Sequence, residues 1–268
     1  MVPLYEELLD SPVLGQLYYS RVRESLLREL IGEAAADIGG AVSEAFDFMM
    51  EYELCDTSVD SRKAQMSFEI YLDEYEAPFL FINAEGTNED ILTFAHEFGH
   101  FSDGYVNMNA YETVDLAEVY SQGMEYLVLS RLDEQLEQDE VDNLAKIKMI
   151  DTVEMYVQQA SFAEFEHRVY ALGSENLSAE VLNEISRQAA KDYGYYSEYY
   201  DPFYALGWVD ITHYFEQPFY IISYPVSNDL AMQYYELELA KAGQGLDRYL
   251  DTLERDYSGM MGDRKSVV

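Results

Sequence analysis

Cysteine is almost absent from this chain of 268 residues, because Cys55 is the only one. No disulfide can therefore form within the chain, and a reducing compartment is the simplest inference. We expect a cytoplasmic protein on this ground. Histidine is also scarce, with four residues in all, so a regular spacing between two of them is informative.

Basic residues are few, since 16 lysines and arginines stand against 52 aspartates and glutamates, and the formal net charge is -36. Such a surface repels nucleic acid phosphates and anionic membranes, and we expect neither as a partner. It would attract cations and basic peptides. A halophilic or acid-tolerant host would explain the acidity without any functional role, and composition leaves this alternative open.

Long hydrophobic runs are missing as well. No uninterrupted apolar stretch approaches the roughly 18 residues that a membrane span needs. The first ten residues, MVPLYEELLD, are acidic and lack the basic-then-apolar order of a secretion signal. The 25 tyrosines indicate amphipathic packing and grooves rather than disorder.

The hydrophobic pattern predicts a mainly α-helical protein with one small β element. Residues 4–54 carry apolar side chains at helical spacing and predict two or more amphipathic helices. Phe68, Ile70 and Leu72 alternate with other side chains and predict a strand. Residues 78–83 predict a second strand, which would pair with the first in an antiparallel manner.

A helix should follow this β element, with Thr87 as its N-cap and Asp90 completing an acidic variant of the capping box. The aromatic stretch 192–208 is predicted to be irregular. A further helix is predicted over about 115–132, and more helix follows it up to about residue 170. Another helix is predicted over 180–191, with Ser178 as its N-cap. The last predicted helix covers 218–242 and is ended by Gly243 and Gly245. We expect a single domain over residues 1–268, with N-terminal helices in 1–54, a core in 55–242 and a C-terminal helix and tail in 243–268.

His96, Glu97 and His100 form an HExxH pattern on the predicted helix. Residues four apart lie on one helix face, so both imidazoles can point at one metal ion. Glu97 is rotated about 100° from His96, which suits a carboxylate that lies beside the metal without binding it. Composition alone gives such a pattern in about 1 chain in 150. The motif therefore predicts a zinc site with His96 and His100 as ligands.

A catalytic zinc site needs a third protein ligand and an open position for water. The longer motif HExxHxxGxxH fails here, because Asp103 and Val106 stand at the last two positions. Glu118 and Glu125 are seven residues apart and share one face of the next predicted helix. One of them can bind metal while the other supports a ligand, and spacing does not choose between them. A solvated acidic face is the alternative.

Three segments in order resemble the oligoendopeptidase F and thimet oligopeptidase family of zinc peptidases, over roughly residues 40–240. The stretch 77–100, APFLFINAEGTNEDILTFAHEFGH, resembles the strand, turn and zinc helix of that family. The stretch 117–126, AEVYSQGMEY, is similar to its third-ligand segment, so Glu118 matches the zinc-binding glutamate. Glu125 then matches an acid that supports a zinc-bound histidine.

The third segment, residues 212–224 with the sequence THYFEQPFYIISY, resembles the family's segment of substrate-facing residues. The resemblance thus implies that His213, Tyr220 and Tyr224 are candidates to stabilise the oxyanion of a tetrahedral intermediate, although core packing is an alternative for the tyrosines. His167 has no role implied by the resemblance and is expected to be a packed or surface residue.

The resemblance and the motif together imply a zinc-dependent metalloendopeptidase that hydrolyses short oligopeptides, with one zinc ion per chain. Zinc would lower the pKa of its bound water and polarise the scissile carbonyl. Glu97 would take the proton from that water and pass it to the leaving amine.

Two departures from the family pattern are visible. Family members are about twice as long and have a helical half that closes over a deep channel, and this chain is expected to lack part of that half. It is either a fragment or a naturally reduced relative with an open cleft. Met66 and Ser67 stand where a small glycine-containing stretch often precedes the substrate-binding strand. One alternative is a catalytically weak, peptide-binding relative without the closing half. A structural zinc domain is another, but a single cysteine gives it no support.

Overall fold

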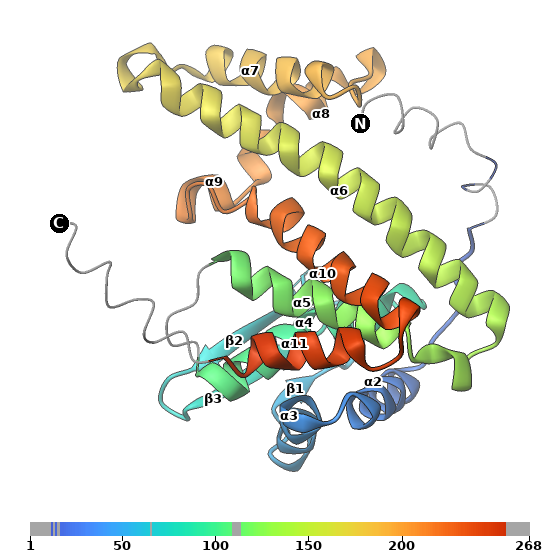
Figure 1. The fold of residues 1–268 in the computed structure, drawn as a ribbon. Coiled ribbons are helices and arrows are strands. Elements are labelled where there is room, and N and C mark those ends of the chain that lie inside the picture. The colour runs from blue at the N-terminus through green and yellow to red at the C-terminus, as the bar shows by residue number, and fades with distance from the viewer. Residues whose placement is uncertain (1–11, 13, 15–16, 65, 109–113, 256–268) are drawn as a thin grey trace. The chain divides into compact units, whose positions relative to one another are not determined.

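The computed structural model describes residues 12, 14, 17–64, 66–108 and 114–255, and the chain forms two compact units (Figure 1). Of the described residues, those up to 17 and those in 146–226 belong to unit 1, and those in 18–145 and 227–255 belong to unit 2. The predicted single domain, with divisions after residues 54 and 242, stays a prediction. Among the residues described, none of the helices combines the length and apolar character that a membrane span requires.

Unit 2 contains a small mixed sheet of three strands in the order β1-β3-β2. Strands β2 (Phe68–Leu72) and β3 (Ala77–Phe81) pair in the predicted antiparallel manner, with Phe68 opposite Phe81. Strand β1 (Cys55–Asp56) pairs with β3 in parallel. The sequence pattern missed β1 because two residues are too short to show any alternation.

The helices of unit 2 surround a packed pair, α4 (Glu89–Asn107) and α5 (Val114–Leu129). The sheet and three further helices pack around this pair (Figure 1), namely α2 (Glu24–Ile38), α3 (Gly40–Glu51) and α11 (Gln244–Leu253). Their apolar faces form one core that also includes Leu80 of β3. The mainly helical fold with a small β element before the histidine-bearing helix is therefore confirmed.

The start of α4 differs in detail from the prediction. Asn88 is the N-cap residue, not Thr87, and no side chain caps the helix. Asp90 instead accepts hydrogen bonds from the backbone N–H groups of residues 85, 86 and 87, at 2.9, 2.7 and 2.9 Å. The carboxylate thus makes the reaching-back half of a capping box and holds the turn that leads from the sheet into α4.

Unit 1 consists of helical segments that are mostly short. Its elements are the greater part of α6 (Gln138–Leu172), η3 (Ser174–Asn176), α7 (Ala179–Asp192), η4 (Glu198–Tyr200), α8 (Asp201–Leu206), η5 (Gly207–Asp210), α9 (His213–Glu216) and the first turn of α10 (Ser223–Ala240). The predicted cap of α7 is confirmed, because the Ser178 hydroxyl accepts the N–H of Val181 at 3.3 Å. The prediction of an irregular stretch at 192–208 was partly wrong. Pro202 lies in the first turn of α8, where its missing N–H costs nothing.

The last predicted helix begins later than expected. Residues 218–222 are not helical, and Phe219 has a φ of 64°, in the left-handed region that an α-helix cannot contain. The helix α10 ends at Ala240, and Gly243, with a φ of 88°, separates it from α11. Gly245 lies inside α11 and does not end α10, because a helix resumes at Gln244. Helix η2 (Leu132–Glu134) follows α5.

Candidate metal centre

Unit 2 brings together three side chains that the sequence predicted as metal ligands. His96 and His100 lie one turn apart on α4, and Glu118 projects from α5. One possible ligand atom from each residue lies within 4.8 Å of the other two, and His96 Nε2 lies 3.7 Å from Glu118 Oε2. The Glu118 side chain is 2% exposed and that of His96 is 25% exposed, so solvent reaches the cluster from the histidine side.

A glycine inside the motif allows the two helices to approach this closely. A Cβ atom on Gly99 would lie 2.5 Å from both the Cα of Ser121 and the carbonyl oxygen of Tyr120. Non-bonded atoms do not approach so closely, so any other residue at this position would push α5 away from α4. Gly99 therefore sets the distance between the histidines and Glu118.

Glu125 occupies the other side of His96. Its Oε1 lies 2.8 Å from His96 Nδ1, which leaves Nε2 to point toward Glu118. Spacing alone left open which of the two glutamates would bind metal, and the family resemblance chose Glu118. The structure groups Glu118, not Glu125, with the candidate ligand atoms of His96 and His100, and it places Glu125 against the other nitrogen of His96. A carboxylate in that position fixes the orientation of a metal-binding imidazole. The Ser121 hydroxyl donates to Glu118 Oε2 at 3.1 Å and orients that carboxylate in turn.

Glu97 is nearly buried beside this cluster, at 8% exposure. It follows His96 on α4, and its carboxylate accepts a hydrogen bond from the backbone N–H of Glu69. Strand β2 is at the sheet edge, so it has N–H groups that the sheet does not use. Burial raises the pKa of Glu97 to about 7, against the opposing charge of His96. The carboxylate can therefore accept and release a proton near neutral pH.

The two imidazoles have opposite pKa shifts. Burial lowers the pKa of His96, but the hydrogen bond and charge of Glu125 outweigh it, and the pKa rises to about 9. Burial lowers the pKa of His100 to about 4, so this ring is neutral at pH 7 and offers a lone pair. A metal ion must displace the proton of His96 before that ring can bind it.

Two further acids near Glu97 were not predicted to have any role. Asp103 of α4 is 1% exposed and accepts a hydrogen bond from the Asn107 side chain at 2.6 Å. Glu69 of β2 has a buried Oε1 with no hydrogen-bond partner among the described residues. Burial, followed by the charges of Asp103 and Glu97, raises the pKa of Glu69 to about 8. Glu69 is therefore mostly protonated at pH 7.

Unit 1 brings together the three predicted substrate-facing residues. The rings of His213 and Tyr220 have centroids 4.7 Å apart, and the Tyr224 hydroxyl lies 3.4 Å from His213 Nε2. Tyr220 and Tyr224 are also in contact, at 5.4 Å between centroids. We name these three residues the His213 cluster. His167 lies apart from them on α6, and its side chain is 76% exposed, as expected for a surface residue.

Glu166 holds the turn between α9 and α10, which carries Tyr220 of the His213 cluster, and the sequence analysis did not identify it. Its side chain on α6 is nearly buried, at 3% exposure, and its Oε1 accepts the N–H of Phe219 at 2.8 Å. Burial raises the pKa of Glu166, although the Phe219 N–H and the charge of His213 oppose the shift. One signal was available, because Glu166 follows Phe162 by four residues and shares its apolar helix face.

Comparison with known proteins extends the resemblance beyond these residues. The sequence model of peptidase family M3 matches residues 41–256. Oligopeptidase PepF of Bacillus subtilis (strain 168) is 25% identical over 186 residues, which are 66% of this chain and 28% of the relative. The chromosomal oligoendopeptidase F of Lactococcus lactis subsp. cremoris is 28% identical over 188 residues, 66% of this chain and 31% of the relative. The chain thus spans less than a third of each curated relative.

A solved structure of PZ peptidase A with an inhibitor has the same fold. The TM-score is 0.79 at 20% sequence identity, and the match covers 92% of this chain and 46% of the other. The match therefore covers most of this chain, while more than half of the neighbour has no counterpart here.

Proposed function

The chain belongs to peptidase family M3, and from this premise we propose that it is a zinc-dependent metalloendopeptidase that hydrolyses short oligopeptides in the cytoplasm. The observation that carries the proposal is the convergence of His96, His100 and Glu118, with the buried carboxylate of Glu97 beside them. The sequence motif and the family match support the same assignment.

The donor set fits zinc. Two imidazole nitrogens and one carboxylate oxygen are a set that catalytic zinc sites use, with the fourth position open. Two donors that each lie about 2.1 Å from a tetrahedral ion are separated by about 3.4 Å. The observed 3.7 Å between His96 Nε2 and Glu118 Oε2 is close to that value. His96, His100 and Glu118 would therefore hold the ion, and Glu125 would orient His96 through the 2.8 Å contact.

When bound, zinc supplies a Lewis acid that polarises a carbonyl group and makes a water molecule more acidic. Glu97 acts as the general base that removes the proton from the attacking water, and it then delivers this proton to the leaving amine. The N–H of Glu69 keeps its carboxylate in place between these two transfers. The family resemblance assigns His213 and Tyr220, with Tyr224 in support, as donors of hydrogen bonds to the oxyanion, and one such donor would lower the barrier by about 3 kcal/mol.

The test is the variant Glu97→Gln, which keeps the shape of the side chain and removes the base. We expect zinc content equal to that of the parent by elemental analysis. Hydrolysis of quenched peptides of 5–15 residues should fall about 1,000-fold, because general base catalysis contributes 10²- to 10⁴-fold. A chelator should abolish the parent activity, and added zinc should restore it.

Two results would contradict the proposal. Cleavage by Glu97→Gln at the parent rate would show that another group is the base. A parent protein that holds zinc and binds peptides without cleaving them would favour the alternative, a peptide-binding relative, which the partial coverage of the relatives makes worth testing.

A further inference from the structure

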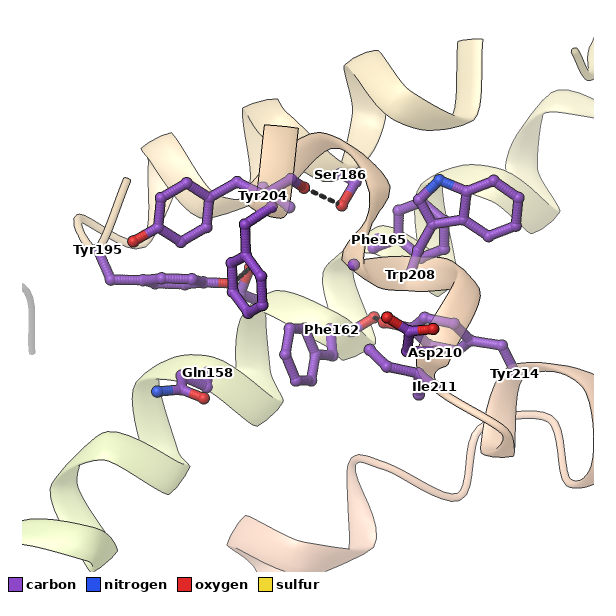
Figure 2. Close-up of a pocket in the computed structure, with 14 residues that line it drawn as sticks. Gln158, Phe162, Phe165, Ser186, Tyr195, Tyr204, Trp208, Asp210, Ile211 and Tyr214 are labelled. Carbon is purple, nitrogen blue, oxygen red and sulfur yellow. Dashed lines mark hydrogen bonds between the residues drawn. The ribbon is translucent and has the colours of Figure 1, made fainter. Parts of the chain in front are cut away.

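Unit 1 contains a cavity that the proposed peptidase chemistry does not use. Its volume is about 370 Å³, and its walls come from α6, α7, α8, η5 and the residues that flank them (Figure 2). Pockets of roughly 300–1,000 Å³ hold small organic molecules in other proteins. The cavity is therefore large enough for a ligand.

Aromatic rings form much of the wall. Seven of the fourteen lining residues are aromatic, and the labelled rings of Phe162, Trp208 and Tyr195 come from different elements (Figure 2). The Phe165 ring has a centroid 6.1 Å from that of Trp208 and 5.0 Å from that of Tyr214. The faces of aromatic rings carry partial negative charge, so such a wall attracts organic cations.

Most of the hydroxyl groups on the wall are already hydrogen-bonded within the protein. Tyr195 donates to the Ser161 hydroxyl at 2.9 Å, and Tyr214 donates to the carbonyl of Phe162 at 2.9 Å. Ser186 donates to the backbone carbonyl of residue 204 at 2.6 Å, a bond that Figure 2 shows as a dashed line. These three bonded hydroxyl groups shape the wall, whereas the side chains of Tyr204 and Gln158 make no hydrogen bond with any described residue and offer uncharged polar groups to a ligand.

Asp210 is different. It is the only charged group among the lining residues that the structure describes, and no lysine, arginine or histidine is among them. Its exposed carboxylate makes no hydrogen bond or ion pair with any described residue. A carboxylate without a protein partner beside aromatic faces is complementary to an ammonium group on an apolar body. The net charge of -36 adds a long-range attraction for cations.

We propose that this cavity binds a small organic cation, a primary ammonium group carried on an aromatic body. The ammonium group pairs with Asp210, and the body lies against Phe165, Trp208 and Tyr214. The site is distinct from the metal centre and from the His213 cluster, and it does not depend on the proposed hydrolysis.

The chain offers a built-in reporter for this site, because Trp208 is its only tryptophan. The probe is phenethylammonium, titrated into the full chain while Trp208 fluorescence is excited at the red edge, where tyrosine does not absorb. We expect a saturable change with a Kd of about 1 mM, as the small size of the probe allows. Asp210→Asn should raise that Kd about fivefold, since Asp210 is exposed to solvent.

The controls separate the contribution of the ammonium charge to binding from the contribution of burying the aromatic ring. Glu198→Gln removes the same charge from a nearby exposed position outside the cavity and should leave the Kd unchanged. Phenylacetate and phenethyl alcohol have the same ring without the positive charge and should bind at least fivefold more weakly. Equal binding of the three probes, or an equal Kd in Asp210→Asn, would overturn the assignment to a cation. No saturable change with any probe at tens of millimolar would overturn the site itself.

Discussion

The metal centre of unit 2 and the His213 cluster of unit 1 are built in different ways. The metal centre lies on two long helices whose other faces belong to one apolar core, and its geometry follows from helix periodicity and from Gly99. The His213 cluster lies on a four-residue helix, the turn after it and the first turn of α10, and ring contacts and Glu166 hold it. A rigid scaffold positions the first set, whereas a few polar and aromatic contacts position the second.

The sharpest test of this contrast is the pair Glu118→Ala and Glu125→Ala. Removing Glu118 deletes a predicted ligand, so zinc affinity should fall by more than the 10- to 100-fold that is typical of a residue supporting a ligand. Removing Glu125 frees His96 Nδ1 but leaves the donor set intact, so the loss of zinc affinity should stay within 10- to 100-fold. Competition with a chelating dye measures both affinities. The reverse order would exchange the roles of the two glutamates.

A second test asks whether helix packing, rather than the motif alone, builds the metal centre. Gly99→Ala forces a Cβ against the backbone of α5, and we expect a destabilisation of about 3 kcal/mol together with weaker zinc binding. Gly207→Ala in unit 1 is the matched control. Its Cβ would meet no atom within 4 Å, and its φ of -58° suits alanine, so stability should stay equal or rise by about 0.5 kcal/mol.

Urea unfolding followed by far-ultraviolet circular dichroism gives both free energies of unfolding. If Gly99→Ala were as stable as the parent and bound zinc as tightly, α4 and α5 would not be in the close contact described here. A large loss of stability in Gly207→Ala would show that the effect of alanine does not depend on the space around each glycine.

The same contrast explains what the sequence could and could not predict. The HExxH motif and helical spacing were enough to name His96 and His100, and spacing along the next helix made Glu118 and Glu125 joint candidates for the third ligand. The family resemblance was needed to choose Glu118 over Glu125, because both lie on one helix face. Glu166 and Glu69 were missed because their contacts are distant in the sequence. Glu166 contacts Phe219, which lies 53 positions further along the chain, and Glu69 contacts Glu97, which lies 28 positions further along.

Short elements also escaped the pattern. Phe219 has a left-handed backbone conformation, which sequence analysis normally expects only at glycine or asparagine. The apolar residues around it were therefore interpreted as the first turn of the helix predicted from residue 218. Strand β1 and helix α8 are two and six residues long. Tertiary contacts determine the conformation of such short segments, and the periodicity of a single sequence carries no information about these contacts.

A third test concerns the buried acid of β2. The pKa of Glu69 in the folded chain is about 8 and lies above its usual value of 4.5. The folded state therefore holds a proton that the unfolded state releases, so the parent loses stability as pH rises from about 4.5 to about 8. Glu69→Gln cannot lose a proton, and in chelated protein it should be about 2 kcal/mol more stable than the parent at pH 9.

At pH 4 the two proteins should have equal free energies of unfolding, because Glu69 is then protonated in both states. Glu74→Gln, in the exposed turn between β2 and β3, is the matched control and should show no such pH dependence. A stability difference for Glu69→Gln that is the same at both pH values would mean that Glu69 has the same pKa in the folded and unfolded states.

The smallest expected effect tests the weaker scaffold of unit 1. A left-handed backbone at a residue other than glycine costs on the order of 1 kcal/mol, and a buried hydrogen bond to a charged group contributes about 1.5–3 kcal/mol. Glu166 can therefore hold Phe219 in this conformation, and with it the adjacent Tyr220. Glu166→Leu removes the acceptor, and we expect kcat/KM for peptides to fall about tenfold while zinc affinity is unchanged.

Glu166→Gln separates the two contributions of this side chain, because the amide oxygen can still accept the Phe219 N–H while the negative charge is gone. If the hydrogen bond positions Tyr220, this variant should retain most of the activity that Glu166→Leu loses. Glu164→Gln, on the same helix beside Arg168, controls for the loss of an acid and should retain parent activity. A tenfold loss in Glu166→Gln as well would instead assign the effect to the charge that Glu166 presents to His213. Electrostatics, rather than the shape of the turn, would then maintain the His213 cluster.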